Sequence, residues 1–165
     1  MEILKPTSAD IPDIIALAHA SWKATYPAII SQEQIDYMLN LFYNETLIGQ
    51  QLTAEGHHFL MVKDAGHLLG YAHLIEEGDQ IKLSKLYLQP ECKGKGLGRL
   101  LMQALEKLSG DLGFETMTLN VNRSNPALHF YEKMGFRIVE TIDIPLDKFW
   151  LNDYIMEKKI SGAEV

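Results

Sequence analysis

The stretch Lys82–Leu108, KLSKLYLQPECKGKGLGRLLMQALEKL, decides the fold because it joins an apolar strand, a glycine-rich loop and an amphipathic helix. Residues 83–88 are more than half apolar, as expected of a strand that is covered on both faces. Pro90 ends this strand, since proline has no N–H to give to a ladder. Three glycines then stand at every second position, and apolar residues at helical spacing follow them: Gly94, Gly96 and Gly98, then Leu100, Leu101, Ala104, Leu105 and Leu108.

A glycine loop that leads directly into a helix N-terminus is a binding site for phosphate oxygens, because backbone N–H groups and the positive end of the helix dipole are free there. A P-loop requires G-x-x-x-x-G-K followed by Ser or Thr, whereas Gly98 is followed by Arg99 and Leu100. A dinucleotide fold requires G-x-G-x-x-G, whereas the spacing here is two and two. A dinucleotide fold also has an acidic residue about 20 residues after its glycines. Glu115 lies close to that position, so nucleotide binding remains an alternative at this stage.

A second block lies on the C-terminal side of the loop and contains Asn125-Pro126-Ala127 and Phe130–Phe136, FYEKMGF. Together the two blocks resemble the Gcn5-related N-acetyltransferases. The run KGKGLG is similar to the family's acetyl-coenzyme A loop, in which Gln or Arg is followed by x-x-G-x and Gly or Ala. Lys93 takes the place of Gln or Arg, which keeps the charge and loses the planar group. The second block is similar to the family's N-x-x-A-x-x-F-Y-x-x-x-G-F pattern, and the clear resemblance covers residues 70–160.

The resemblance implies an α/β (α+β) fold with a mixed, mostly antiparallel twisted sheet of about six or seven strands and about four helices. It also implies a splay between the strands that end near Leu88 and Asn120. Capping-box spacing at Thr7 and Asp10 and at Ser31 and Gln34 marks two helix starts. The sequence predicts strands at 2–5, 57–63, 68–75, 116–121, 136–144 and 152–160, besides the strand before the loop, and helices that end near 26, 42, 52, 109 and 134. Residues 1–160 are expected to form a single domain and residues 161–165 a flexible tail.

Composition excludes several classes of function. The formal net charge of −7 opposes nucleic-acid binding. No apolar run approaches the 18 or so residues of a membrane span, and Met1-Glu2-Ile3 begins no signal peptide, so a cytoplasmic protein without a membrane partner is expected. Cys92 is the only cysteine, so an internal disulfide is impossible. His57, His58 and His67 have no convincing metal-ligand spacing, and no metal is expected.

The resemblance implies acetyl-coenzyme A as co-substrate. Its pantetheine arm is expected to pair with the strand backbone at Leu86, Tyr87 and Leu88. Its pyrophosphate is expected on the loop residues Lys93, Gly94, Lys95, Gly96, Leu97, Gly98 and Arg99. Asn120 is expected beside the coenzyme at the splay, and Asn125 is expected to cap its helix and touch the coenzyme. The local density of positive charge at Lys82, Lys85, Lys93, Lys95 and Arg99 is expected where the phosphates lie.

Acetyl transfer from a thioester requires a neutral amine and protonation of the leaving thiolate. Tyr131 is predicted to supply that proton, because a phenol with a reference pKa of about 10 is protonated at neutral pH and a thiolate has a reference pKa of about 8.5. The alternative is a buried aromatic side chain with a satisfied hydroxyl. Residues 81–89 contain no acid, so the nearest candidates for a general base are His73, Glu76 and Glu77, acting through water or Ser84. Of these, His73 is the residue we predict.

Aromatic side chains of the N-terminal helices are candidate walls of the acceptor site, with Trp22 and Tyr26 foremost and Tyr37 and Tyr43 beside them. Aromatic residues at this spacing also serve simply as core. The resemblance implies acetylation of a primary amine of a small molecule, and the C-terminal run NDYIMEK looks most like bacterial spermidine and spermine acetyltransferases. A protein amino group, an antibiotic amine and a coenzyme A sensor without turnover remain alternatives. A homodimer is an expectation from the family alone.

Overall fold

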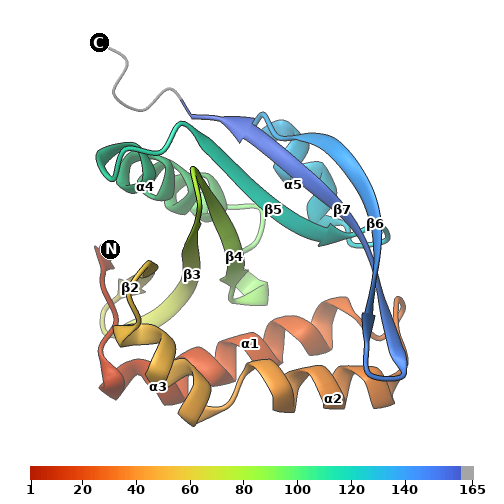
Figure 1. Cartoon of the computed structure of the whole chain (residues 1–165). Helices are drawn as coiled ribbons and strands as arrows, with labels where there is room; N and C mark the ends of the chain where they lie inside the picture. Colours follow the sequence, from red (N-terminus) through yellow and green to blue (C-terminus); the bar gives the residue numbers. More distant parts are fainter. Residues whose placement is uncertain (161–165) are drawn as a thin grey trace.

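The computed structural model describes residues 1–160, which form one open sheet of seven strands with helices on both faces (Figure 1). The strands are β1 (Glu2–Leu4), β2 (His57–Asp64), β3 (His67–Glu77), β4 (Gln80–Leu88), β5 (Thr116–Asn122), β6 (Arg137–Leu146) and β7 (Phe149–Lys159). The α-helices of this part of the chain are α1 (Ile11–Thr25), α2 (Gln32–Phe42), α3 (Glu45–Thr53), α4 (Leu97–Asp111) and α5 (Ala127–Lys133). The strand order is β1-β2-β3-β4-β5-β7-β6, and β4 with β5 is the parallel pair. The mixed, mostly antiparallel sheet confirms the predicted fold class, with five α-helices in residues 1–160 where about four were expected.

Side-chain caps begin the helices where the sequence places them. The backbone N–H of Thr7 donates to Asp10 Oδ2 at 2.8 Å, which closes the predicted capping box before α1. Lys63 Nζ of β2 donates to the other oxygen, Asp10 Oδ1, at 2.8 Å and ties this helix start to the sheet. Ser31 Oγ accepts from the N–H of Gln34 at 3.1 Å and caps α2. These local bonds fix the layer formed by α1 and α2.

Two apolar layers hold the sheet between its helices. On one face, α1 and α3 pack on β2 and β3, and the buried residues there include Ile14, Leu17, Ile48, Phe59 and Tyr71. On the other face, α4 packs on β3, β4 and β5, and the buried residues there include Leu74, Leu83, Leu101, Leu105 and Leu119. In Figure 1, α1, α2 and α3 lie below the sheet, and α4 and α5 lie on its far side. No helix within residues 1–160 is long and apolar enough to cross a membrane.

The parallel pair β4 and β5 separates partway along its length. Its register runs from Ile81 opposite Met117 to Leu83 opposite Leu119 and ends there. The register between β3 and β4 skips Ser84 at the same level, which is a bulge that turns the end of β4. The predicted splay is therefore present, and it opens directly after Leu83.

The last two strands form a longer hairpin than the sequence predicts. Pairing continues to Leu146 opposite Phe149, so the interruption expected over 145–150 is wrong. Pro145 lies within β6 opposite Trp150, where proline is tolerated because β6 is an edge strand and its other side needs no donor. The hairpin tip reaches α2 (Figure 1): Gln34 Nε2 donates to the carbonyl of Trp150 at 3.1 Å, and the Tyr37 and Phe149 rings lie 5.4 Å apart. The tail predicted at 161–165 lies outside the described residues.

Candidate active site

The glycine loop presents an open backbone in front of α4. Gly94 and Gly96 have φ of +78° and +82°, and a Cβ at either position would meet nothing within 4 Å. Gly96 is the N-cap of α4 in the left-handed conformation, so the helix begins at Leu97 and not at Leu100 as the sequence suggested. The first-turn N–H groups of α4 are therefore free beside an accessible surface, which fits a pyrophosphate group.

The charges around this loop are fewer than the sequence suggested. Lys93, Lys95 and Arg99 are exposed in or next to the loop. Lys82 and Lys85 both lie on β4, before the loop, and Lys85 is buried against α2 and the following segment. The prediction of a five-residue phosphate patch is corrected to these three, because Lys82 and Lys85 lie on the face of β4 that α1 and α2 cover. The two lysines are three positions apart and share this face because the bulge at Ser84 shifts the alternation.

The end of β4 has a free side. Leu86, Tyr87 and Leu88 pair with Ala72, Tyr71 and Gly70 of β3. Within residues 1–160 they have no partner on β5, whose ladder ended at Leu119. Their outward N–H and C=O groups are available to an extended chain such as a pantetheine arm, by the same hydrogen bonding that adds a strand to a sheet edge.

Tyr87 is the centre of a cluster of hydroxyl and aromatic groups on the face of β4 that α1 and α2 cover. Trp22 Nε1 of α1 donates to the Tyr87 hydroxyl at 3.0 Å, and the hydroxyl of Tyr43 shares a hydrogen bond with the same oxygen. The Trp22 ring lies 4.4 Å from the Tyr26 ring, centroid to centroid. Burial raises the pKa of Tyr87 and of Tyr43 above the ordinary phenol value, so both phenols remain neutral at physiological pH.

Tyr131 lies on α5 and packs, partly buried, against the core between α4 and the sheet. Its ring packs on Phe130 and Phe136, with centroids at 5.4 Å and 5.9 Å. Burial raises its pKa, and the charge of an ionised Tyr87 would raise it further. The phenol therefore keeps its proton at neutral pH.

Asn125 links α5 to α1 across the splay. Its Oδ1 accepts from the N–H of Ala127 at 2.9 Å and so starts α5. Its Nδ2 donates to the Tyr26 hydroxyl at 3.2 Å. The Asn125 side chain thus caps α5, the helix that carries Tyr131, and also orients the Tyr26 side chain, a candidate lining residue of the acceptor site.

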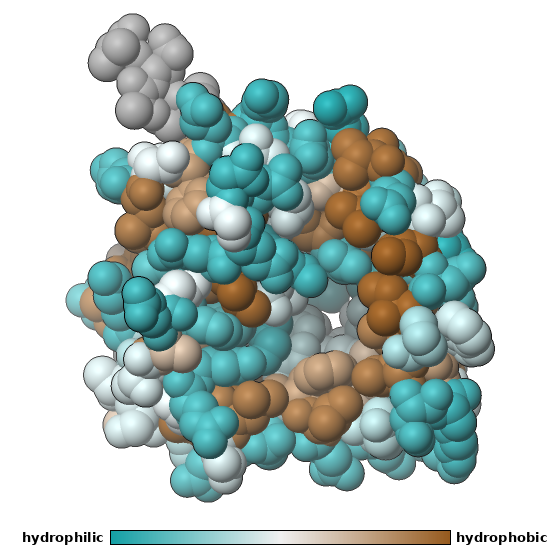
Figure 2. All heavy atoms as spheres, in the orientation of Figure 1, coloured by the Kyte–Doolittle hydropathy of each residue, from teal (hydrophilic) through white to brown (hydrophobic). Residues whose placement is uncertain are grey.

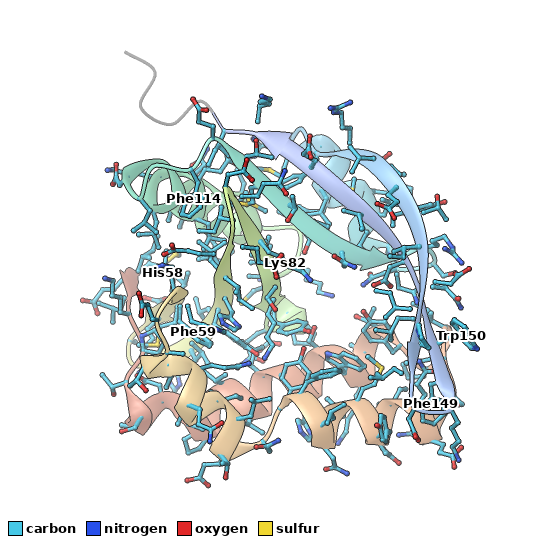
Figure 3. All side chains as sticks on the ribbon, in the orientation of Figure 1. His58, Phe59, Lys82, Phe114, Phe149 and Trp150 are labelled. Carbon is cyan, nitrogen blue, oxygen red and sulfur yellow. The ribbon has the colours of Figure 1, made fainter. Side chains whose placement is uncertain are left out.

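The space enclosed by these groups opens at the molecular surface. Figure 2 shows the molecule hollowed between the layer of α1 and α2 and the strands β5 and β7. Asn120 of β5 lies on this side, and its Nδ2 lies 3.5 Å from Asp153 Oδ2 of β7. Figure 3 shows Lys82 reaching from β4 towards the same opening. The structure therefore brings together Trp22, Tyr26, Tyr87, Asn120, Asn125 and Tyr131, all of which the sequence placed in the site.

His73 is not brought to this cluster. Its side chain is fully buried and stacks on Phe59 at 4.0 Å, and its Nε2 is hydrogen-bonded to His57 Nδ1 at 2.8 Å. Burial, with the nearby positive charge of Lys85, lowers its pKa to about 3. A histidine so reluctant to accept a proton does not suit the role of general base, so we withdraw the assignment of that role to His73. Glu76, near the end of β3, pairs with His58 of β2 at 2.7 Å.

Lys85 is a buried cation without a carboxylate partner within 4 Å in the described part of the chain. Its Nζ lies 4.5 Å from the centroid of the Tyr43 ring and 3.4 Å from the carbonyl of Phe42. Burial lowers its pKa to about 8. The folded protein therefore releases this proton at a lower pH than the unfolded chain does.

Replacing Lys85 by Met is expected to change how stability depends on pH. Between pH 8 and the ordinary lysine value of 10.5, the unfolded wild type binds more protons than the folded one, so its free energy of unfolding rises with pH over this window. The Met variant lacks this gain. Urea denaturation of both proteins from pH 6 to 10.5 measures it, with the exposed Lys107→Met as control. Parallel curves for wild type and Lys85→Met would contradict the assignment.

Two polar groups of the candidate site were not predicted from the sequence. Tyr87 was predicted only through its backbone, and its hydroxyl is the centre of the cluster. Asp153 was not singled out, although a signal exists: it stands between Leu151 and Ile155 on one face of β7, where alternation calls for a third apolar side chain. An acidic residue between two apolar residues on the same face of a strand indicates that this face borders a polar cavity.

Comparisons with known proteins agree with this geometry. A family model described as an acetyltransferase (GNAT) domain matches residues 28–158. The chain is 30% identical over 164 residues to the spermidine N(1)-acetyltransferase of Thermoplasma acidophilum, covering 96% of this chain and 97% of that protein. It is also 30% identical over 153 residues to an uncharacterized N-acetyltransferase of Mycobacterium tuberculosis, covering 92% and 98% of the two chains.

Solved structures give the same result for the fold. The crystal structure of the PaiA N-acetyltransferase from Thermoplasma acidophilum in complex with coenzyme A superposes with a TM-score of 0.86 at 30% identity, covering 96% of this chain and 98% of that one. A Gcn5-related N-acetyltransferase from Rhodopseudomonas palustris superposes with a TM-score of 0.82 at 23% identity, covering 96% and 94%. The chain therefore belongs to the acetyltransferase (GNAT) family and is an N-acetyltransferase.

Proposed function

We propose that the protein uses acetyl-coenzyme A to acetylate a primary amine of a small molecule, with polyamines as the first candidates. The observation that carries the proposal is the splay that opens after Leu83, together with the open glycine loop that follows the end of β4. A relative at 30% identity is named for spermidine, and a neighbouring structure at the same identity holds coenzyme A. The net charge of −7 suits a cationic acceptor.

The residues of the chain fit acetyl-coenzyme A in two places. The open backbone at Gly94 and Gly96 and the first turn of α4 would hold the pyrophosphate, with Lys93, Lys95 and Arg99 adding charge. The free side of Leu86–Leu88 would pair with the pantetheine arm. Acetyl-coenzyme A supplies the activated acetyl group when bound.

Tyr131 then serves as the proton donor. A neutral amine nitrogen would bond to the acetyl carbon, the carbon–sulfur bond would break, and the sulfur would leave with the bonding electrons and take the proton of the Tyr131 hydroxyl. The proton that the acylated nitrogen loses would return to the Tyr131 oxygen through water, so that the products are an acetamide and a free thiol. The raised pKa keeps Tyr131 protonated at neutral pH, so its hydroxyl is available to donate to the leaving sulfur. The layer of Trp22, Tyr26 and Tyr87 excludes water from this point and positions the acceptor.

Thermal denaturation with ligands tests the coenzyme assignment. A ligand that binds only the folded state stabilises it by about 2.7 kcal/mol at 100 times its dissociation constant. Acetyl-coenzyme A and coenzyme A are expected to raise the melting temperature, and ATP and NAD are not. A shift with ATP or NAD alone would contradict the proposal.

The variant Gly96→Ala sharpens this experiment, and Gly78→Ala is its control. Both glycines have positive φ, +82° and +65°, and open space where a Cβ would stand. Each variant is therefore expected to lower the melting temperature without ligand through backbone strain of about 1–2 kcal/mol. Only Gly96→Ala is expected to lose most of the acetyl-coenzyme A shift, since its methyl group occupies the surface that the phosphates approach. An equal acetyl-coenzyme A melting-temperature shift in both variants would show that the glycine loop is not part of the coenzyme-binding site.

A further inference from the structure

We propose that Asp153, supported by Asn120, receives the ammonium group of the acceptor and so determines specificity for cationic amines. This inference rests on the proposed function and adds the acceptor subsite to it. Three observations carry it: the face of β7 on which Asp153 lies, the lack of a close cation for its carboxylate, and the aromatic groups opposite it.

The register of the sheet places Asp153 on the helix-facing side. Asp153 lies opposite Asn122 of β5, and Ile155 lies opposite Asn120. Side chains at cross-strand positions share a face, so Asn120 and Asp153 point the same way. Leu151, two residues before Asp153 on that face, packs on the cluster that contains Trp22 and Tyr26. The carboxylate therefore faces α1 across the hollow of Figure 2.

The Asp153 carboxylate is left without an ion pair in the described residues. Its one polar contact there is Asn120 Nδ2 at 3.5 Å, and no Lys, Arg or His nitrogen of residues 1–160 lies within 4.0 Å. Arg123 is the nearby arginine, but its Nη2 bonds to Asp143 at 2.6 Å and its Nη1 holds the carbonyl of Asp153 at 3.2 Å. The guanidinium thus fixes the backbone and leaves the carboxylate available to a cation from outside.

The groups around Asp153 suit an ammonium ion. Burial raises the pKa of Asp153, and the hydrogen bond from Asn120 and the charges of Lys82 and Arg123 partly oppose this shift. The charge of Asp153 contributes to the raised pKa of Tyr26, the residue that ends α1. The rings of Trp22 and Tyr26, tilted by 34° with centroids 4.4 Å apart, offer π faces to a cation.

Asp153 is assigned to binding and not to proton removal. A carboxyl group has a reference pKa of about 3.9 and an alkylammonium of about 10.4, so direct transfer to the carboxylate is strongly uphill. An ion pair needs no such match. The carboxylate holds the cation, and the neutral amine forms when a proton leaves to water.

Steady-state kinetics with spermidine test the assignment in Asp153→Asn, with Asp147→Asn as the matched control. Both changes remove one negative charge from the β6–β7 hairpin, and Asp147 lies exposed in its turn at φ +55°, a conformation that Asn tolerates. Asp153→Asn is expected to raise KM for spermidine about 10- to 100-fold, as for loss of a charged hydrogen bond, with a smaller change in kcat. Asp147→Asn is expected to match wild type, and all three proteins are expected to show the same melting-temperature shift with acetyl-coenzyme A.

The pH dependence of kcat/KM for spermidine gives a second measurement, and a purely structural role of Asp153 would leave the fall of kcat/KM at low pH, here called the acid limb, unchanged. In wild type, kcat/KM for spermidine is expected to fall as pH drops through the raised pKa of Asp153, because the protonated acid no longer attracts the cation. Asp153→Asn is expected to lack this limb. Lys82→Met is expected to move the limb to higher pH, since the charge that lowers the pKa of Asp153 is gone. The other ionisable groups around Asp153, namely Arg123, Tyr26 and Tyr131, stay unchanged in both variants.

The outcomes separate the two proposals. If wild type acetylates spermidine and Asp153→Asn has the same KM and the same acid limb, the assignment of Asp153 is overturned and the proposed function stands. If wild type binds acetyl-coenzyme A and acetylates no amine in a panel of polyamines, the proposed function fails and the subsite fails with it. If Asp153→Asn raises KM for spermidine and abolishes the acid limb of kcat/KM, both the proposed function and the assignment of Asp153 are supported.

Discussion

Replacing Tyr131 by Phe is expected to lower kcat about 10²- to 10⁴-fold, the range for loss of a positioned proton donor, while KM for acetyl-coenzyme A changes little. The Phe ring keeps the packing on Phe130 and Phe136, so the variant is expected to fold. Measuring thiol release with spermidine as acceptor checks the rate, and the acetyl-coenzyme A melting shift checks that the coenzyme is still bound.

Tyr71→Phe is the control for this experiment. The Tyr71 hydroxyl is buried on the same side of the sheet as Tyr87 and has no hydrogen-bond partner in the described residues. Removing an unsatisfied hydroxyl costs little or stabilises, so kcat is expected to stay at the wild-type value. An unchanged kcat in Tyr131→Phe as well would reduce Tyr131 to a buried aromatic side chain of the core.

Replacing Leu101 by Ala is expected to lower the free energy of unfolding by about 2–5 kcal/mol. Leu101 is fully buried in α4, in the cluster that joins this helix to β3, β4 and β5. The expected loss combines the transfer of the leucine side chain and the cavity that it leaves. Urea denaturation measures the change, and Leu112→Ala at the other end of α4, where the side chain is 41% exposed, is expected to stay within about 0.5 kcal/mol of wild type.

The same variant links the core to the coenzyme site. If acetyl-coenzyme A binds the N-terminus of α4 only in the folded protein, 100 times its dissociation constant is expected to restore about 2.7 kcal/mol to Leu101→Ala. A variant whose stability does not respond to acetyl-coenzyme A, while wild type does respond, would show that the cavity has spread to the loop.

Features that depend on neighbours in sequence were predictable. The caps at Ser31 and Asn125 and the open loop at Gly96 follow from bonds and dihedral angles within a few residues. The splay was also expected, through resemblance to a family, and the register that ends at Leu83 confirms it. The start of α4 was placed late because Gly98 reads as loop, although it lies in the first turn, where a Cβ would come within 3.1 Å of the Phe130 ring.

Features that depend on contacts between distant strands were not predictable from the sequence. His73 looked like a candidate base until Phe59 and His57 of the neighbouring strand were found to enclose it. Pro145 looked like a break because the sequence does not say that β6 is an edge strand. Asp153 acquires its character from Asn120 on β5 and the helix layer opposite, and neither neighbour is near it in the chain.

The contact between the β6–β7 hairpin and α2 has a consequence for folding. Gln34 and Trp150 are 116 residues apart in the chain, and Lys148 Nζ meets Glu33 at 2.9 Å beside them. Closing so long a loop is entropically costly, whereas the glycine loop needs only β4 and α4, which are consecutive. During unfolding in denaturant, the tip of the β6–β7 hairpin is therefore expected to detach from α2 first. The region proposed to hold the acceptor would then unfold while β4, the glycine loop and α4 remain folded.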